Sequence, residues 1–187
     1  MKGFFQEDLA GGGGTKLKFT VEEARQLYGI ENWGAGYFDI NEAGSLTIRP
    51  IKNNSNQIDI KKVVDELILK GIAPPILLRF PQLLESQIRE IYESFGRAIE
   101  EFHYNGKYRM AFPMKVNQRR VVIENIIAAG ARYNIGLEVG SKPELLMAMA
   151  VDLPRESLII CNGFKDISYL RTAFLGRQIG KNVFVVI

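Results

Sequence analysis

Hydrophobic and polar residues alternate at two different spacings along this chain, and each spacing predicts its own kind of structure. Near the start, a capping box formed by Thr20 and Glu23 opens a short amphipathic helix that ends at Gly29. Two short apolar runs follow at residues 37–40 and 45–49, separated by turn-forming residues. This stretch therefore predicts one helix and a β-hairpin.

Two longer amphipathic helices are predicted in the next part of the chain. Asp59 is a typical helix N-cap residue, and apolar residues then recur at helical spacing until Gly71. Three apolar residues at 76–78, which follow two prolines, predict a short strand. From Leu84 to Phe102, apolar residues recur in steps of three and four, which indicates a long helix with one apolar face.

From residue 108 onward, a short apolar strand followed by a single helix is repeated along the chain. The expected strands are 108–114, 134–139, 158–161 and 183–187, and the expected helices are 118–129, 141–151 and 166–178. Single helices between strands require parallel pairing with right-handed crossovers. The pattern therefore predicts an α/β fold, and it fits half of an eight-stranded barrel as well as a small doubly wound sheet.

The composition of the 187-residue chain is that of a globular protein, with 47% hydrophobic and 24% charged residues. Its formal charge of +3 is spread along the sequence, so nothing predicts a nucleic-acid partner. No stretch approaches the roughly 20 apolar residues that span a bilayer, so no membrane association is predicted. The single Cys161 excludes an internal disulfide and a cysteine metal site, and the single His103 leaves little scope for imidazole chemistry. We expect a protein of the reducing cytoplasm.

Three parts are expected along the chain. Residues 1–19 contain four consecutive glycines and are predicted to be a disordered lead-in. Residues 20–58 hold the N-terminal helix and the hairpin, and residues 59–187 hold the α/β part. Because the sequence stops inside an apolar strand, we expect the chain to be a fragment of a longer protein.

In parallel α/β folds, ligands bind beyond the C-terminal ends of the strands, so the residues that follow each strand are the candidates for chemistry. Lys115 ends an apolar strand, where its amine would lie partly desolvated and could act as an imine-forming nucleophile. A lysine that begins a solvated loop has the same position in the sequence. The pattern alone leaves both interpretations open.

Polar residues also follow the next two predicted strands. Glu138 could orient a cation or transfer a proton, although a pair with Lys142 explains an acid there equally well. Ser141 starts a capping box with Glu144, so it caps a helix or contacts a phosphate. Asn162 precedes a glycine, which indicates either a close approach to a ligand or a simple turn. No residue is predicted to bind a metal.

Five short segments of the sequence together form a specific pattern. They are Trp33-Gly34 with Tyr37-Phe38, Arg79-Phe80-Pro81-Gln82, Phe112-Pro113-Met114-Lys115-Val116-Asn117-Gln118, Gly136-Leu137-Glu138-Val139-Gly140-Ser141-Lys142-Pro143-Glu144-Leu145, and Cys161-Asn162-Gly163-Phe164-Lys165-Asp166. In this order and at this spacing, they resemble the biosynthetic arginine decarboxylases of bacteria and plants. The resemblance runs from about Tyr28 to the end of the chain.

That family binds pyridoxal phosphate on an alanine-racemase-like (β/α)8 TIM barrel, which is followed by a β domain. The resemblance implies that residues 59–187 form about four βα units of this barrel, and that the short strands before them belong to the β domain. It also implies that Lys115 forms the imine with the cofactor and that Glu138 is an acidic pocket residue near it. Ser141 and Asn162 are implied as further cofactor contacts.

The reaction implied by the resemblance converts L-arginine to agmatine and carbon dioxide, an entry from arginine catabolism into putrescine and spermidine synthesis. The family usually requires Mg²⁺ and forms homo-oligomers, either dimers or tetramers. Residues expected to bind the phosphate and the pyridine nitrogen are missing from the chain, so we expect it to be inactive alone. Two alternatives remain: a decarboxylase for another basic amino acid on the same barrel, and a non-catalytic module that binds pyridoxal phosphate or a partner.

Overall fold

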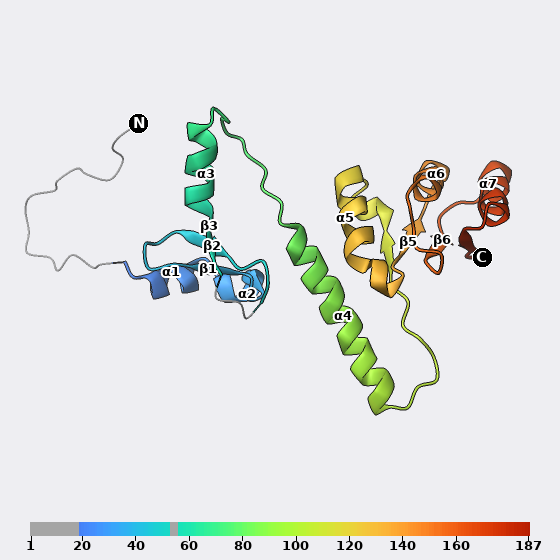
Figure 1. Ribbon diagram of the computed structural model, residues 1–187, viewed down its shortest axis with the longest axis horizontal. Helices are drawn as coiled ribbons and strands as arrows, with labels where there is room; N and C mark the ends of the chain where they lie inside the picture. Colours follow the sequence, from blue (N-terminus) through green and yellow to red (C-terminus); the bar gives the residue numbers. More distant parts are fainter. Residues whose placement is uncertain (1–18, 53–55) are drawn as a thin grey trace, which may run out of the picture. The chain divides into compact units, whose positions relative to one another are not determined.

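The computed structural model describes residues 19–52 and 56–187, and Figure 1 labels its helices and strands. The predicted glycine-rich lead-in lies, except for residue 19, outside the described residues. Two compact units divide the described chain. The first comprises residues up to Arg49 together with Asn56–Ala73, and the second comprises Pro74–Ile187 together with the described residues of 50–55.

The first unit is built on an antiparallel sheet. Its helices and strands within the described residues are α1 (Val21–Leu27), α2 (Ile30–Gly34), β1 (Phe38–Ile40), β2 (Leu46–Ile48), β3 (Ile58–Asp59) and α3 (Ile60–Leu69), with the sheet order β1-β2-β3. The predicted capping box opens α1, because the Thr20 hydroxyl accepts from Glu23 N and the Glu23 carboxylate accepts from Thr20 N. The predicted first helix and hairpin are confirmed.

Three features of the N-terminal half differ from the sequence patterns. β3 was not predicted, because a strand of two residues is too short to show alternation. Residues 76–78 form no strand, since no strand of either described sheet pairs with them. α3 groups with the first unit, whereas the three-part division of the sequence placed residue 59 and all later residues together. That division remains a prediction.

The second unit is built on a parallel sheet. Its strands are β4 (Ala111–Pro113), β5 (Gly136–Val139), β6 (Leu158–Cys161) and β7 (Asn182–Val185), its α-helices are α4 (Pro81–Glu101), α5 (Arg120–Gly130), α6 (Lys142–Ala150) and α7 (Ile167–Gln178), and its 3-10 turns are Met114–Val116 and Ala131–Tyr133. Each of β5, β6 and β7 pairs in parallel with the strand that precedes it in the chain. The predicted α/β fold is confirmed.

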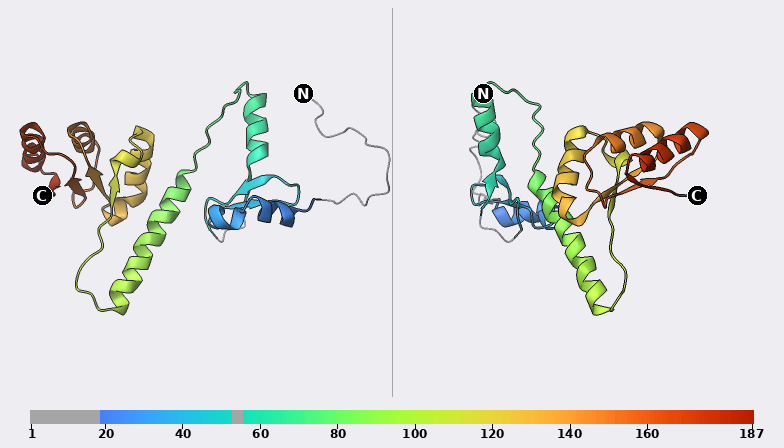
Figure 2. Two further views of the ribbon diagram at one scale, coloured as in Figure 1. Left: turned by 180° about the vertical axis from the view of Figure 1, so that it is seen from behind. Right: turned by 45° about the vertical axis from the view of Figure 1, so that its right-hand side comes forward.

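The order of the strands separates the two α/β architectures that the sequence pattern left open. Right-handed crossovers that always step in one direction place all connecting helices on the same face of a sheet. Figure 2 shows α5, α6 and α7 as one layer along the β4-β5-β6-β7 sheet. A doubly wound sheet would need a reversal of strand order, so this unit has the winding of a (β/α)8 barrel.

The core of the second unit lies between the sheet and this helix layer. Alternate strand residues face the helices and are almost fully buried: Leu137, Val139, Ile159, Cys161 and Val183. Residues between them face the other side, where the Phe184 side chain remains 51% exposed. One face of the sheet therefore forms the core, and the other presents side chains away from the helices.

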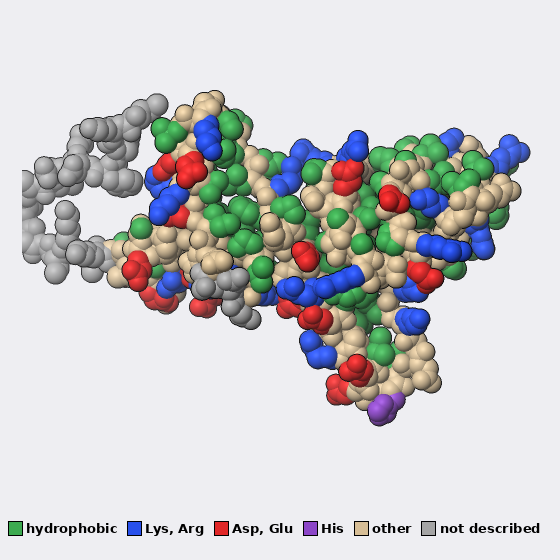
Figure 3. Space-filling model, viewed as in Figure 1, with side chains coloured by type: hydrophobic (Ala, Val, Ile, Leu, Met, Phe, Trp, Pro, Cys, Tyr) green, Lys and Arg blue, Asp and Glu red, His purple; other side chains and the backbone are tan. Residues whose placement is uncertain are grey.

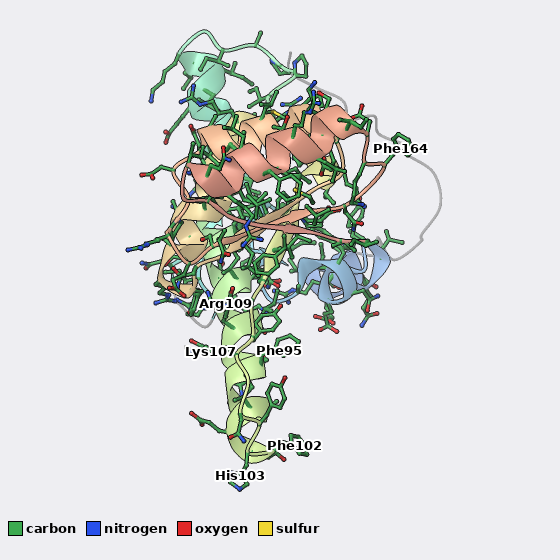
Figure 4. All side chains as sticks on the ribbon, turned by 90° about the vertical axis from the view of Figure 1, so that its right-hand side faces the viewer. Phe95, Phe102, His103, Lys107, Arg109 and Phe164 are labelled. Carbon is green, nitrogen blue, oxygen red and sulfur yellow. The ribbon has the colours of Figure 1, made fainter. Side chains whose placement is uncertain are left out.

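α4 extends this core at one side of the unit. Ile88 of α4 packs with Ile126 and Ile135 in a second apolar cluster. Figure 4 shows the C-terminal end of α4, marked by Phe102 and His103, projecting beyond the sheet of the same unit. On the face shown in Figure 3, positive and negative side chains of the described residues are interspersed.

Candidate active site

The residues expected to carry chemistry lie at the C-terminal ends of three neighbouring parallel strands. Lys115 follows β4, Glu138 lies on β5, Ser141 follows β5, and Asn162 follows β6. β4 pairs with β5 and β5 pairs with β6, both in parallel, so the C-terminal ends of these strands lie side by side along one edge of the sheet, which is called the C-terminal edge. The fold therefore brings the four residues to the edge where parallel α/β proteins bind their ligands.

Lys115 lies in the 3-10 turn that directly follows β4. Met114, the residue before it, turns into the core and is 1% exposed, whereas Lys115 is exposed. The expectation that the lysine amine is partly desolvated is therefore wrong for this structure. Lys115 is exposed because β4 is the outer strand of the described sheet and has a neighbouring strand, β5, on one side only. An exposed primary amine is accessible to an incoming aldehyde.

Glu138 lies on the face of β5 opposite to the buried Leu137 and Val139. Both of its carboxylate oxygens are buried, and neither has a hydrogen-bond partner among the described residues. The alternative that Lys142 pairs with this acid is wrong, because Lys142 Nζ donates to Ser168 Oγ at 2.7 Å. A buried carboxylate without a partner is destabilising by several kcal/mol, roughly, so this position calls for a cation or a donor.

Ser141 is the N-cap of α6, and its hydroxyl accepts from Glu144 N at 3.4 Å. The other half of the predicted capping box is not formed. The Glu144 carboxylate instead accepts from Gly140 N and from Gln118 Nε2, each at 2.6 Å. Glu144 is 6% exposed, so its two oxygens join the segment after β4 to the segment after β5 inside the protein.

Asn162 follows β6, and its side chain is exposed. Its N–H donates to the Val139 carbonyl, the last of β5, at 2.7 Å. The next residue, Gly163, has a φ of +69°, and a Cβ at that position would lie 2.1 Å from the Gly140 carbonyl oxygen. The backbone segments after β5 and β6 therefore touch, and this contact requires glycine.

Tyr169 completes this edge of the sheet from the helix side. Its side chain is 2% exposed, and its hydroxyl donates to Val139 O at 3.1 Å and to Asn162 O at 3.3 Å. Burial raises the pKa of the Tyr169 phenol, and the neighbouring Cys161 thiol and the charges of Glu144 and Glu138 raise that pKa further. The phenol therefore remains a neutral hydrogen-bond donor at physiological pH.

Sequence reasoning missed Glu144 as a buried acceptor and missed Tyr169 entirely. Both residues occupy the third position of a helix that follows a strand, in α6 and α7. Each side chain bridges the end of its own strand and the end of the preceding strand. An alignment of the two βα units in the sequence would have shown that Glu144 and Tyr169 occupy the same position, and this is the signal that could have identified them.

The residues at this edge fit pyridoxal phosphate. The cofactor needs an accessible amine to bind through its aldehyde, and Lys115 supplies one. The buried oxygens of Glu138 lack a partner within the described chain, as expected of an acid that faces a cationic group of a ligand. No three His, Cys, Asp or Glu side chains gather to hold a metal ion within residues 19–52 and 56–187.

Comparison with known proteins gives close relatives. The chain is 44% identical to the biosynthetic arginine decarboxylase of Bacteroides thetaiotaomicron over 170 residues, which are 91% of this chain and 27% of that protein. It is 45% identical to the biosynthetic arginine decarboxylase of Pseudomonas putida, across 91% of this chain and 26% of that protein. The chain thus spans about a quarter of the length of these relatives.

A solved structure and a family model give the same result. The crystal structure of the biosynthetic arginine decarboxylase SpeA from Campylobacter jejuni superposes with a TM-score of 0.78 at 39% identity, covering 86% of this chain and 26% of that one. Residues 87–185, which include all four parallel strands, match the family model of the pyridoxal-dependent decarboxylase, pyridoxal binding domain. The chain therefore belongs to the pyridoxal-dependent decarboxylases, and most of its second unit is their pyridoxal binding domain.

Proposed function

We propose that the protein containing this chain is a pyridoxal-phosphate-dependent decarboxylase that converts L-arginine to agmatine and carbon dioxide for polyamine synthesis. The observation that carries the proposal lies at the C-terminal ends of two neighbouring strands. Lys115 is exposed after β4, and the buried oxygens of Glu138 on β5 have no partner among the described residues. Identity of 44% to a biosynthetic arginine decarboxylase supports arginine as the substrate.

Each of the four predicted site residues has a role in this proposal. Lys115 holds the cofactor through its Nζ atom, and Glu138 faces a positive charge of the bound cofactor or substrate. Ser141 Oγ and the Asn162 amide supply polar contacts from the segments after β5 and β6. When bound, pyridoxal phosphate accepts the electron pair that remains when the carboxylate leaves the substrate.

The chain's own chemistry then concerns protons and charge. Lys115 Nζ, once released from the cofactor, is a primary amine that can return a proton to the product carbon. The Glu138 carboxylate, shielded from water, favours a protonated group beside it more strongly than an exposed acid would. The Glu144 carboxylate is already bonded to Gly140 and Gln118, so it supports the edge rather than taking part in proton transfer.

Further properties belong to the same proposal on the strength of the family resemblance. These are a Mg²⁺ requirement, a role in arginine catabolism and homo-oligomer formation. The composition of the sequence adds the absence of a nucleic-acid partner and a cytoplasmic location. Among the helices of residues 19–52 and 56–187, none has the length and apolar character needed to cross a membrane.

A substrate assay tests the proposed reaction. The protein expressed from the complete reading frame is incubated with pyridoxal phosphate and, separately, with arginine, ornithine, lysine or diaminopimelate. We expect carbon dioxide and agmatine from arginine at a kcat/KM well above that for the other three. Preferential release of carbon dioxide from another basic amino acid would support the rival substrate, and no turnover of any would support a non-catalytic binding module.

A pair of lysine variants tests the cofactor attachment. We expect Lys115→Ala to lose the visible absorbance of the bound cofactor and the label fixed by borohydride reduction. Lys142→Ala is the matched control, because Lys142 lies close in sequence to the same strand ends but donates to Ser168 instead. Retention of both signals by Lys115→Ala would show that another residue holds the cofactor.

A further inference from the structure

The segments after β5 and β6 are joined by one buried hydroxyl. Tyr169, in the first turn of α7, directs its phenol between the carbonyls of Val139 and Asn162, at 3.1 and 3.3 Å. A phenol has one proton to donate, so the two carbonyls share it. The hydroxyl thus bonds the last residue of β5 and the first residue after β6 at the same time.

Two backbone contacts bring these segments together at the same point. The Asn162 N–H donates to the Val139 carbonyl at 2.7 Å, and Gly163 packs directly on the Gly140 carbonyl. Neither contact fixes the Asn162 carbonyl, which the Tyr169 hydroxyl bonds from the helix side. The register of the two segments therefore depends on a side chain that lies in the core.

The two segments carry the polar groups that the proposed function assigns to the cofactor. Ser141 follows Gly140 directly, and Asn162 is itself one of the residues bonded by Tyr169. Groups that position a ligand must be held within about 0.5 Å of the productive geometry, and a misplacement of about 1 Å can reduce a reaction rate by about 100-fold. Tyr169, at 2% exposure beneath this surface, can influence the site only through the segments it bonds.

We propose that Tyr169 is a positioning residue that holds the segments after β5 and β6 in the register needed to bind pyridoxal phosphate. This inference rests on the proposed function, because the ligand is the cofactor of that reaction. The neutral phenol of Tyr169 acts through the Val139 and Asn162 carbonyls and does not touch the ligand. The burial that keeps the phenol protonated makes this action independent of pH across the physiological range.

Two tyrosine-to-phenylalanine variants of the complete protein test the inference. Tyr169→Phe removes the bridging hydroxyl and keeps the ring. Tyr92→Phe is the matched control, because the Tyr92 hydroxyl accepts from Met110 N at 3.1 Å. Met110 lies just before the start of β4, so this bond is at the N-terminal ends of the strands, away from the proposed site. The measurements are the dissociation constant of pyridoxal phosphate, hydrogen exchange of the Gly140 and Asn162 amides, and the melting temperature.

For Tyr169→Phe, we expect pyridoxal phosphate to bind about 5- to 10-fold more weakly, as the loss of one buried hydrogen bond predicts. The Gly140 and Asn162 amides should exchange faster by a similar factor. Tyr92→Phe should lower the melting temperature by about as much as Tyr169→Phe does, because each variant loses one hydroxyl. It should change the cofactor dissociation constant by less than about twofold. Gly163→Ala, which forces the same segments apart, should reproduce the loss of cofactor affinity.

Equal cofactor affinity and equal amide exchange in the two tyrosine variants would overturn the positioning role. A loss of affinity by Tyr169→Phe without faster exchange would also overturn it, because the segments would not have moved. Wild-type protein that binds no pyridoxal phosphate would instead overturn the proposed function. The amide exchange data distinguish these failures, since they are measured without the cofactor.

Discussion

Asp39 on β1 of the antiparallel sheet and Glu138 on β5 of the parallel sheet are both half-buried strand acids, but their surroundings are opposite. Asp39 accepts from Arg25 Nε at 2.7 Å, from Arg49 at 3.3 Å and from the Ile40 N–H at 2.7 Å. Both oxygens of Glu138 are buried without a partner among the described residues. The first acid stabilises its sheet, whereas the described residues supply no partner for the second, as the proposed role in cofactor binding requires.

The buried Glu144 provides the strongest test of what a paired acid contributes. We expect Glu144→Ala to lower the free energy of unfolding by about 3 kcal/mol, because Gly140 N–H and Gln118 Nε2 lose a charged acceptor inside the protein. Glu144→Gln, which keeps one acceptor, should lose less. Denaturant unfolding followed by circular dichroism measures both values. Equal losses would mean that packing, rather than hydrogen bonding, holds this edge of the sheet.

Asp39→Asn should destabilise the first unit by about 1 kcal/mol at pH 7, since the two arginines lose a half-buried partner. Burial acts to raise the pKa of Asp39, but the hydrogen bonds from Arg25 and Ile40 and the charges of Arg25 and Arg49 outweigh it and hold that pKa below its usual value. The stabilisation is therefore present above the unfolded-state pKa of about 3.9 and is lost as the pH falls through the lower folded-state pKa.

The single tryptophan, Trp33, lies in α2 and makes fluorescence a selective probe of this unit. The difference between wild type and Asp39→Asn in urea unfolding should shrink from pH 7 to pH 3. Asp65→Asn, which breaks an exposed pair with Lys61 in the same unit, is the control. A difference that stays constant with pH would contradict the assigned ion pairs.

Glu138→Gln should change the free energy of unfolding in the opposite direction to Asp39→Asn, by a similar or smaller amount. Replacing a buried carboxylate that has no partner in the described part of the chain by a neutral amide should stabilise the cofactor-free second unit by about 1 kcal/mol. The same change should weaken binding of pyridoxal phosphate, so stability and binding move in opposite directions. Thermal unfolding and cofactor titration measure the two effects. A loss of stability like that of Asp39→Asn would mean that Glu138 has a structural partner.

The smallest effect is expected at the surface of α5. Arg120 and Glu124 form an i,i+4 pair at 2.7 Å, but the Arg120 side chain is 88% exposed. Solvent screens such pairs, so Arg120→Ala should unfold at a melting temperature close to that of the wild type. A large change in melting temperature would show that an exposed ion pair contributes as much as the half-buried pairs of Asp39, and would contradict the importance given to burial.

The sequence patterns located the repeating βα units well, because strand alternation and helical periodicity are local properties. The expected strand 158–161 is β6 itself, and the expected helix 166–178 differs from α7 by its first residue. The positions of Lys115, Glu138, Ser141 and Asn162 at strand ends follow from the same local patterns.

The contacts that organise the site were beyond local reasoning. Glu144 meets Gln118 across 26 residues of sequence, and Tyr169 meets Val139 across 30. Whether Glu138 has a partner, and whether Lys115 is exposed, depends on neighbours brought close only by the folded sheet. Periodicity carries no information on which side chains meet over such distances.

The strand order β4-β5-β6-β7 also has a consequence for how the second unit is made on the ribosome. Each of β5, β6 and β7 pairs with the strand synthesised immediately before it, so among the four strands only β4 waits for a later one. Every later βα unit can dock onto the outer strand of the growing sheet as it emerges, and pairing between consecutive strands keeps their sequence separation as short as a parallel sheet allows. This strand order therefore allows the nascent sheet to grow by addition of strands at one side, in the direction of translation.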